Sequence, residues 1–181
     1  MVDSVAEAAV PNTLTGVARI LVHSGKLQQR AAEEVTRLAR DQRRNFVAAA
    51  VGAGALSASE MAHTLSTALS VPLLDLDAVD PARLPQNLVD ARTLAQYQVL
   101  VLGKRGNRIF IGGSDPTDQE AVDRIKFATQ LTPEWVIVEQ DKLGRILEGK
   151  STSATEALEN IVAGDFDFDV EEQKARLAAM P

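Results

Sequence analysis

The stretch that decides the fold reads Ile109-Phe110-Ile111-Gly112-Gly113-Ser114-Asp115-Pro116-Thr117-Asp118-Gln119-Glu120-Ala121-Val122-Asp123-Arg124-Ile125-Lys126-Phe127-Ala128-Thr129. Its apolar start, which stops at two glycines, is typical of a β-strand. Asp115 or Thr117 is a candidate N-cap for a helix from Thr117 to about Gln130. Small and apolar residues then recur at spacings of three and four, as in a helix with one buried face. The stretch therefore predicts a strand-to-helix junction.

The residues on both sides of this junction predict a small α/β module with a three-stranded sheet. The expected strands are 97–102, 108–111 and 135–138, and residues 104–107 are the expected hairpin turn. Residues 88–94 and a last segment from Asp141 onward predict helices. Helices interleaved with strands in this way favour a sheet with one covered face.

The residues before this module contain an internal repeat. Helical patterns cover approximately residues 13–22, 28–43, 46–51 and 57–69, with Ser57 or Ser59 as a cap and Glu60 in the first turn of the last. Val22, Gly25 and Leu27 align at a constant offset with Val51, Gly54 and Leu56. Two helix-turn-helix units are expected to form one four-helix unit.

The predicted fold class is therefore α+β, with four parts along the chain. Residues 1–12 are expected to be disordered, 13–70 to form the helical repeat, 71–149 the α/β module and 150–181 an acidic linker. From Lys150 onward there are seven acidic and three basic residues. Acids alternate with aromatic residues in Gly164–Asp169, which is either a docking motif or, by the favoured interpretation, a solvated linker.

Composition excludes several kinds of protein. The 181 residues include no cysteine, which excludes disulfides and thiolate metal sites. A net charge of −6 argues against a general nucleic-acid-binding protein. The apolar runs are shorter than the ~20 residues needed to span a bilayer, and no secretory signal begins the chain. We expect a protein of the cytoplasm.

No set of residues predicts catalysis. A phosphate-binding Gly-x-x-x-x-Gly-Lys-Ser/Thr loop is missing from the sequence. His23 and His63 have no partners at metal-ligand spacing. Asp115 is expected to cap a helix, and Asp118 and Asp123 are five residues apart, which does not place them on one helical face. We expect no catalytic, cofactor-binding or metal-binding residues and therefore no enzyme in this chain.

Several motifs resemble those of a known family. They are Tyr97–Leu102, Lys104–Ile111, Asp115-Pro116-Thr117-Asp118, Ala121, the helix Asp123–Thr129 and Val138-Glu139. Together they resemble the N-terminal domain, of the MshEN type, of PilB-type type IV pilus assembly ATPases. The related type II secretion ATPases of the GspE kind share this domain. The resemblance covers roughly residues 14–149.

This resemblance implies a non-catalytic regulatory and docking domain, joined by a linker to a hexameric ATPase that extends pili. ATP and magnesium would belong to the ATPase domain, whose phosphate loop this sequence lacks. The implied location is the cytoplasm, at the inner face of the bacterial inner membrane. Implied partners are the chain's own hexameric ATPase domain and the pilus platform proteins of that membrane, with no nucleic acid among them.

Some members of the family bind cyclic di-GMP through two tandem Arg-Leu-Gly-x-x-Leu-Val-x-x-Gly motifs. Here the first three positions hold Gly16, Val17 and Ala18 in one repeat and Asn45, Phe46 and Val47 in the other. Both arginines and both opening glycines of the pattern are missing from their positions. The arginines within 37–44 are a candidate electrostatic substitute. On these residues, direct binding of cyclic di-GMP is the alternative rather than the leading hypothesis.

The leading hypothesis from the resemblance is protein contact. Family members with a degenerate motif resemble those that bind a PilZ-type adaptor, which connects them to cyclic di-GMP indirectly. The candidate contact residues are Val17, Ile20, Leu21, Phe46, Val47, Arg43 and Arg44. The competing interpretation is that about half of the apolar ones close the four-helix core.

Overall fold

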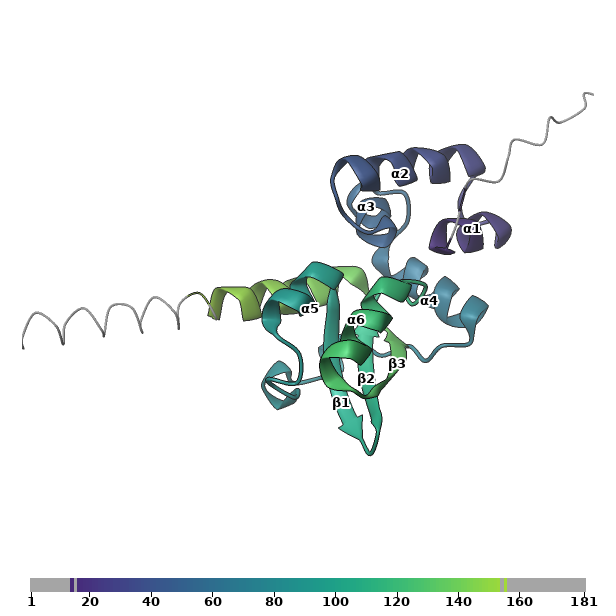
Figure 1. Ribbon diagram of the computed structural model, residues 1–181. Coiled ribbons are helices and arrows are strands. Elements are labelled where there is room, and N and C mark those ends of the chain that lie inside the picture. The colour runs from purple at the N-terminus through teal and green to yellow at the C-terminus, as the bar shows by residue number, and fades with distance from the viewer. Residues whose placement is uncertain (1–13, 15, 154, 156–181) are drawn as a thin grey trace, which may run out of the picture.

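A computed structural model describes residues 14, 16–153 and 155. Within them a helical unit precedes a unit built on a three-stranded sheet, and the two are in contact (Figure 1). The predicted α+β class is confirmed. The predicted disorder of residues 1–12 lies outside the described residues, as does most of the predicted linker 150–181.

The helical unit contains the four predicted helices. They are α1 (Gly16–His23), α2 (Gln29–Asp41), α3 (Phe46–Gly52) and α4 (Ala58–Leu69). The backbone N–H of Glu60 donates to Ser57 Oγ over 3.2 Å, which confirms Ser57 as the cap of α4. Residues spaced three and four apart on these helices form one core, with Leu21, Ala32, Ala50 and Leu65 fully buried.

The sheet has the order β1-β2-β3 and is mixed. Strand β1 (Val99–Arg105) pairs antiparallel with β2 (Arg108–Gly113) through a turn in which Gly106 has a φ of 59°. Strand β3 (Thr132–Ile137) runs parallel to β2, as the crossover through helix α6 (Gln119–Thr129) requires. A second core forms around the fully buried Ile109, Ile111 and Ile125.

Three predicted boundaries are wrong by a few residues. Helix α5 (Ala91–Tyr97) begins later than predicted because Asp90 caps it, accepting from the Thr93 N–H over 2.8 Å. Tyr97 therefore lies in a helix rather than in the first strand. Helix α6 is capped by Asp118, which accepts from the Ala121 N–H over 3.0 Å, and not by Asp115 or Thr117.

The segment between the two units is ordered by short polar contacts. It contains the 3₁₀ turns η1 (Leu76–Ala78) and η2 (Pro81–Arg83). The ammonium of Lys142 lies 2.7 Å from Asp75, 2.9 Å from Asp77 and 3.2 Å from Glu139. It thereby ties η1 to the last helix, residues 140–153, which continues past the boundary expected at Gly149.

Two contacts connect the helical unit to the sheet. Ile137, at the end of β3, is fully buried in the core of the helical unit. Leu73 forms a parallel bridge to the same residue. The end of β3 thus fixes α4 next to the sheet.

Candidate functional site

The two halves of the helical repeat share one backbone geometry. Gly25 and Gly54 follow α1 and α3 with φ angles of 69° and 73°, in the left-handed region. In both, the glycine N–H donates over 3.1 Å to the carbonyl three residues earlier, on Val22 and on Val51. Neither glycine has an atom within 4 Å of an added Cβ. The predicted repeat is therefore confirmed, and its glycines serve chain reversal.

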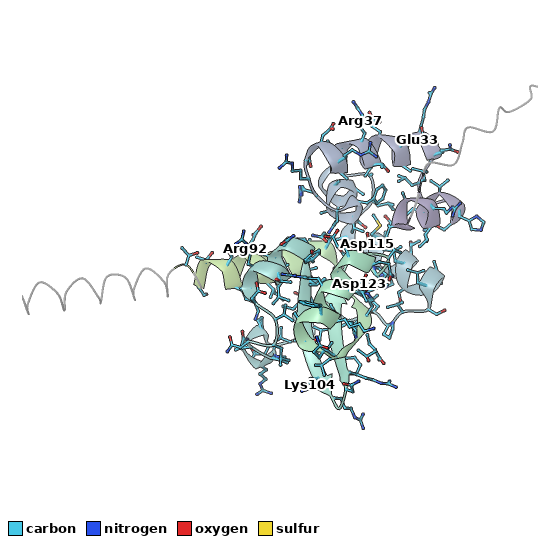
Figure 2. All side chains as sticks on the ribbon, in the orientation of Figure 1. Glu33, Arg37, Arg92, Lys104, Asp115 and Asp123 are labelled. Carbon is cyan, nitrogen blue, oxygen red and sulfur yellow. The ribbon has the colours of Figure 1, made fainter. Side chains whose placement is uncertain are left out.

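The start of the first repeat unit touches the strand-to-helix junction. Gly16 has a φ of 56°, and a Cβ placed on it would lie 2.7 Å from the hydroxyl oxygen of Thr117. In Figure 2, Asp115 lies where the helical unit meets the sheet unit. The junction thus faces the positions at which the family's ligand motif would begin.

A hollow of about 350 Å³ lies at this contact. Its lining comes from the starts of α1 and α3, from α2 and from the junction: Gly16, Val17, Ala18, Thr36, Phe46, Asp115, Thr117 and Asp118. Two carboxylates therefore stand opposite the apolar start of the repeat.

The two carboxylates have different surroundings. Asp115 Oδ1 accepts from the backbone N–H of Thr117 over 2.9 Å and from its hydroxyl over 2.6 Å. Burial raises the pKa of the Asp115 carboxyl above its ordinary value, the hydrogen bonds from Thr117 oppose that rise, and the charge of Asp118 adds to it. Asp118 Oδ1 accepts the hydrogen bond from the Ala121 N–H that caps α6.

A second hollow, of about 280 Å³, continues from Asp118 toward the turn between α2 and α3. Its lining is mostly polar: Arg43, Arg44, Asn45, Ala48, Ala95, Gln96, Tyr97, Gln98, Asp118 and Glu148. Arg43 has a φ of 52°, which ends α2 and turns the chain toward α3. Neither Arg43 nor Arg44 forms an ion pair with another described residue.

Because Asp118 lines both hollows, we call the two together the inter-unit groove. One part of the groove is apolar and contains the carboxylates of Asp115 and Asp118. The other part contains the guanidinium groups of Arg43 and Arg44, which form no ion pair among the described residues. Such a groove can bind a polar ligand or a protein segment, but it has no nucleophile paired with a base. In the described part of the chain, no group of three His, Cys, Asp or Glu side chains could hold a metal ion.

The structure divides the predicted contact residues. Val17, Leu21 and Val47 are at most 2% exposed and close the helical core, as the competing interpretation expected. Arg43 and Arg44 are exposed, and Phe46 is half-buried; all three line the inter-unit groove.

Ile20, the remaining predicted contact residue, is half-buried and lines a separate hollow of about 530 Å³ beside Arg19 and His23. The accessible members of the predicted set therefore lie at two places.

Sequence reasoning missed the junction side of the groove. The sequence predicts Asp115 or Thr117 as a helix cap and Tyr97 and Gln98 as part of a strand, and it gives Asp118 no role in a site. The Asp-Pro-Thr motif was visible in the sequence, but no local pattern places it against Gly16, because that contact joins the two units.

Comparison with known proteins adds the family. Residues 69–149 match the model of the MshEN domain. The chain contains an MshEN domain. The matched residues are the sheet unit, so the helical repeat and its part of the groove precede the match, and the resemblance seen in the sequence is confirmed.

The relatives found are type IV pilus assembly ATPases. The chain is 30% identical over 158 residues to the type IV pilus assembly ATPase PilB of Pseudomonas aeruginosa, and 30% identical over 161 residues to PilB of Acinetobacter baylyi. These matches cover 87% and 89% of this chain but only 27% and 28% of the relatives. The part matched corresponds to the N-terminal domain of such ATPases, and the catalytic domain is not covered.

Solved structures share the fold. The N-terminal domain of XpsE matches with a TM-score of 0.58 and 21% identity, over 73% of this chain and 91% of that one. A structure of MshE with cdg, cyclic di-GMP, matches with a TM-score of 0.54 and 22% identity, over 75% and 98%. Among the described residues, no helix has the length and apolar character needed to cross a bilayer.

Proposed function

We propose that this chain is the regulatory, non-catalytic domain of a PilB-type pilus assembly ATPase and that it receives its signal at the inter-unit groove. The similarity to PilB over 87% of the chain carries this proposal. The location in the groove rests on its position, since it joins the helical repeat to the MshEN unit. A ligand at such a junction can change how the two units pack, and packed interfaces respond in discrete steps.

The first candidate ligand is cyclic di-GMP, bound directly. The MshE structure with cdg favours it, because the two folds correspond over most of this chain. The missing motif arginine of the second repeat has near substitutes, since Arg43 and Arg44 come immediately before Asn45 and are unpaired and exposed. Guanidinium groups suit both phosphate binding and stacking on guanine.

The carboxylates of the groove limit this binding. Asp115 and Asp118 stand beside the position where the first motif arginine is replaced by Gly16. A dianionic ligand there would meet negative charge, so we expect it to lie toward Arg43 and Arg44. Equilibrium dialysis of the whole chain against labelled cyclic di-GMP tests the candidate, and a Kd of the order of 10 µM or tighter is expected. Absence of binding at ten times that concentration would end it.

The second candidate is a PilZ-type adaptor. It is favoured by the side chains that replace the cyclic di-GMP motif in this chain. Phe46 presents a half-buried aromatic ring in the groove beside two carboxylates, a combination suited to a protein segment with an apolar and a basic side chain. Calorimetry with the PilZ protein of the same organism tests it. We expect Phe46→Ala to weaken binding at least about tenfold, and Phe127→Ala, an exposed phenylalanine on α6, to leave it unchanged.

The two candidates are separable. Loss of dinucleotide binding in a variant that still binds the adaptor would assign the groove to cyclic di-GMP. The reverse result would assign it to protein contact. Binding of neither by the unmodified chain would contradict the regulatory proposal for the groove.

A further inference from the structure

A large hollow of the sheet unit lies away from the inter-unit groove, between the proline-containing segment after η1 and the last helix. It has a volume of about 850 Å³. Its lining is Pro81, Ala82, Pro85, Gln86, Asn87, Val89, Asp90, Ala91, Leu94, Arg145, Ile146, Gly149, Lys150 and Ser153. We call it the helix-end pocket. None of these residues takes part in the proposed function.

The pocket has an apolar floor and a basic edge. Val89 and Leu94 form part of the second core, and Ile146 packs against that core while still reaching the pocket. Arg145 is exposed and forms no ion pair with another described residue. Among the described residues, Lys150 donates to the neutral amide oxygen of Gln86, over 3.1 Å, and pairs with no acid. Within the part of the chain that the structure describes, the pocket thus offers two cations without acidic partners beside an apolar surface.

One carboxylate, that of Asp90, also lines the pocket, but it is already engaged. It accepts from the backbone N–H of Thr93 over 2.8 Å and from the Thr93 hydroxyl over 2.7 Å, as the cap of α5. Its charge is therefore directed toward the first turn of α5. The local balance at the pocket remains basic, in a chain whose net charge is −6.

A matching segment occurs in the same chain, outside the described residues. Residues 164–172 read Gly-Asp-Phe-Asp-Phe-Asp-Val-Glu-Glu, with Phe166 and Phe168 between acids. In an extended chain, alternate side chains point to opposite sides, so both rings would face one way and the flanking acids the other. This arrangement complements an apolar floor with a basic edge.

We propose that residues 164–172 bind in the helix-end pocket of their own chain, with the two aromatic rings on its apolar floor and the acids near Arg145 and Lys150. Ser153 lies at the pocket, and Gly164 follows eleven positions later in the sequence. A chain of that length spans up to about 36–40 Å when extended, which is enough to return to the pocket. Closing so short a loop costs little additional entropy.

The absence of cysteine makes a direct test simple. A single nitroxide on Val170→Cys in the whole chain is expected to broaden the amide NMR signals of Gln86, Asn87 and Val89, relative to the same sample after ascorbate reduction. In the spin-labelled chain, Phe166→Ala with Phe168→Ala is expected to abolish that broadening. Phe127→Ala, which removes an aromatic ring 73% exposed on α6, is the matched control and should retain it.

A charge-reversal variant and a mixed sample complete the test. Arg145→Glu with Lys150→Glu should also remove the broadening, because the acids would then meet negative charge. A mixture of spin-labelled unenriched chain with unlabelled ¹⁵N chain should show none. Broadening of the same signals in the mixture as well would overturn the proposal in favour of a second copy, and absence of broadening in every sample would overturn it outright.

Discussion

The hydroxyl oxygen of Thr117 lies 2.7 Å from the point that a Cβ atom would occupy on Gly16, and this is one of the places where the two units touch. Gly16 opens the helical repeat, while Thr117 is held by two hydrogen bonds to Asp115 in the junction. A side chain at position 16 would therefore have to displace a hydroxyl that is already fixed.

Gly16→Ala should destabilise the chain more than Gly25→Ala does. Both residues have positive φ, so each substitution costs about 1–2 kcal/mol from the left-handed backbone. Only Gly16 adds a collision, because Gly25 has no atom within 4 Å of an added Cβ. Urea unfolding measures both. When Thr117 is also replaced by alanine, the additional loss of unfolding free energy of Gly16→Ala over Gly25→Ala should become smaller. An unchanged difference would contradict the contact between position 16 and the Thr117 hydroxyl.

Asp115→Asn should flatten the dependence of stability on pH. Burial raises the pKa of Asp115 in the folded chain, so folding favours its protonated form. The stabilisation from that carboxyl is therefore fully present below its unfolded pKa of about 3.9 and is lost as the pH rises through the higher folded pKa. Asparagine keeps the acceptor for Thr117 and has no charge to bury.

Urea unfolding between pH 3 and pH 7 checks this difference. Relative to the variant, the unmodified chain should gain stability toward low pH. Asp123→Asn, at an exposed position on α6 (Figure 2), is the control and should follow the unmodified chain. Parallel curves for the unmodified chain and Asp115→Asn would contradict the raised pKa of Asp115.

Ser114→Ala should cost about 1–3 kcal/mol of unfolding free energy. Ser114 and Gln140 are both buried, and the serine hydroxyl donates to the amide oxygen of Gln140. That bond connects the end of β2 to the last helix, and its loss leaves a buried oxygen without this donor. Thermal and urea unfolding measure the loss.

The double variant Ser114→Ala with Gln140→Leu should lose less than the sum of the two single variants, because no buried amide then remains unsatisfied. Strictly additive losses would mean that the two side chains do not depend on each other.

The sequence predicts the type of most elements because the patterns that define them are local. The repeat glycines at 25 and 54, the Ser57 cap and the strand before Gly112 all depend on neighbouring residues. The shifted start of α5 arises because Asp90 supplies a better cap than the residues before it.

The groove itself is not predictable from local patterns. Gly16 and Thr117 meet across 101 positions of sequence, and only the packing of β3 against the helical unit brings them together. Apolar spacing also cannot separate a core face from a docking face. Val47 belongs to the core, whereas the neighbouring Phe46, at the start of α3, is half-buried and lines the groove.

The proposed function makes Arg43 and Arg44 the cationic contacts through which the inter-unit groove receives its signal. Calorimetric titration of cyclic di-GMP into the whole chain tests it most directly, with Arg43→Glu/Arg44→Glu compared to Arg37→Glu/Arg40→Glu, which reverses two exposed arginines of α2 outside the groove. We expect the unmodified chain to bind, with binding at least about tenfold weaker in the first variant, as expected for lost charge-assisted hydrogen bonds, and unchanged in the second. Equal binding by all three proteins would contradict it.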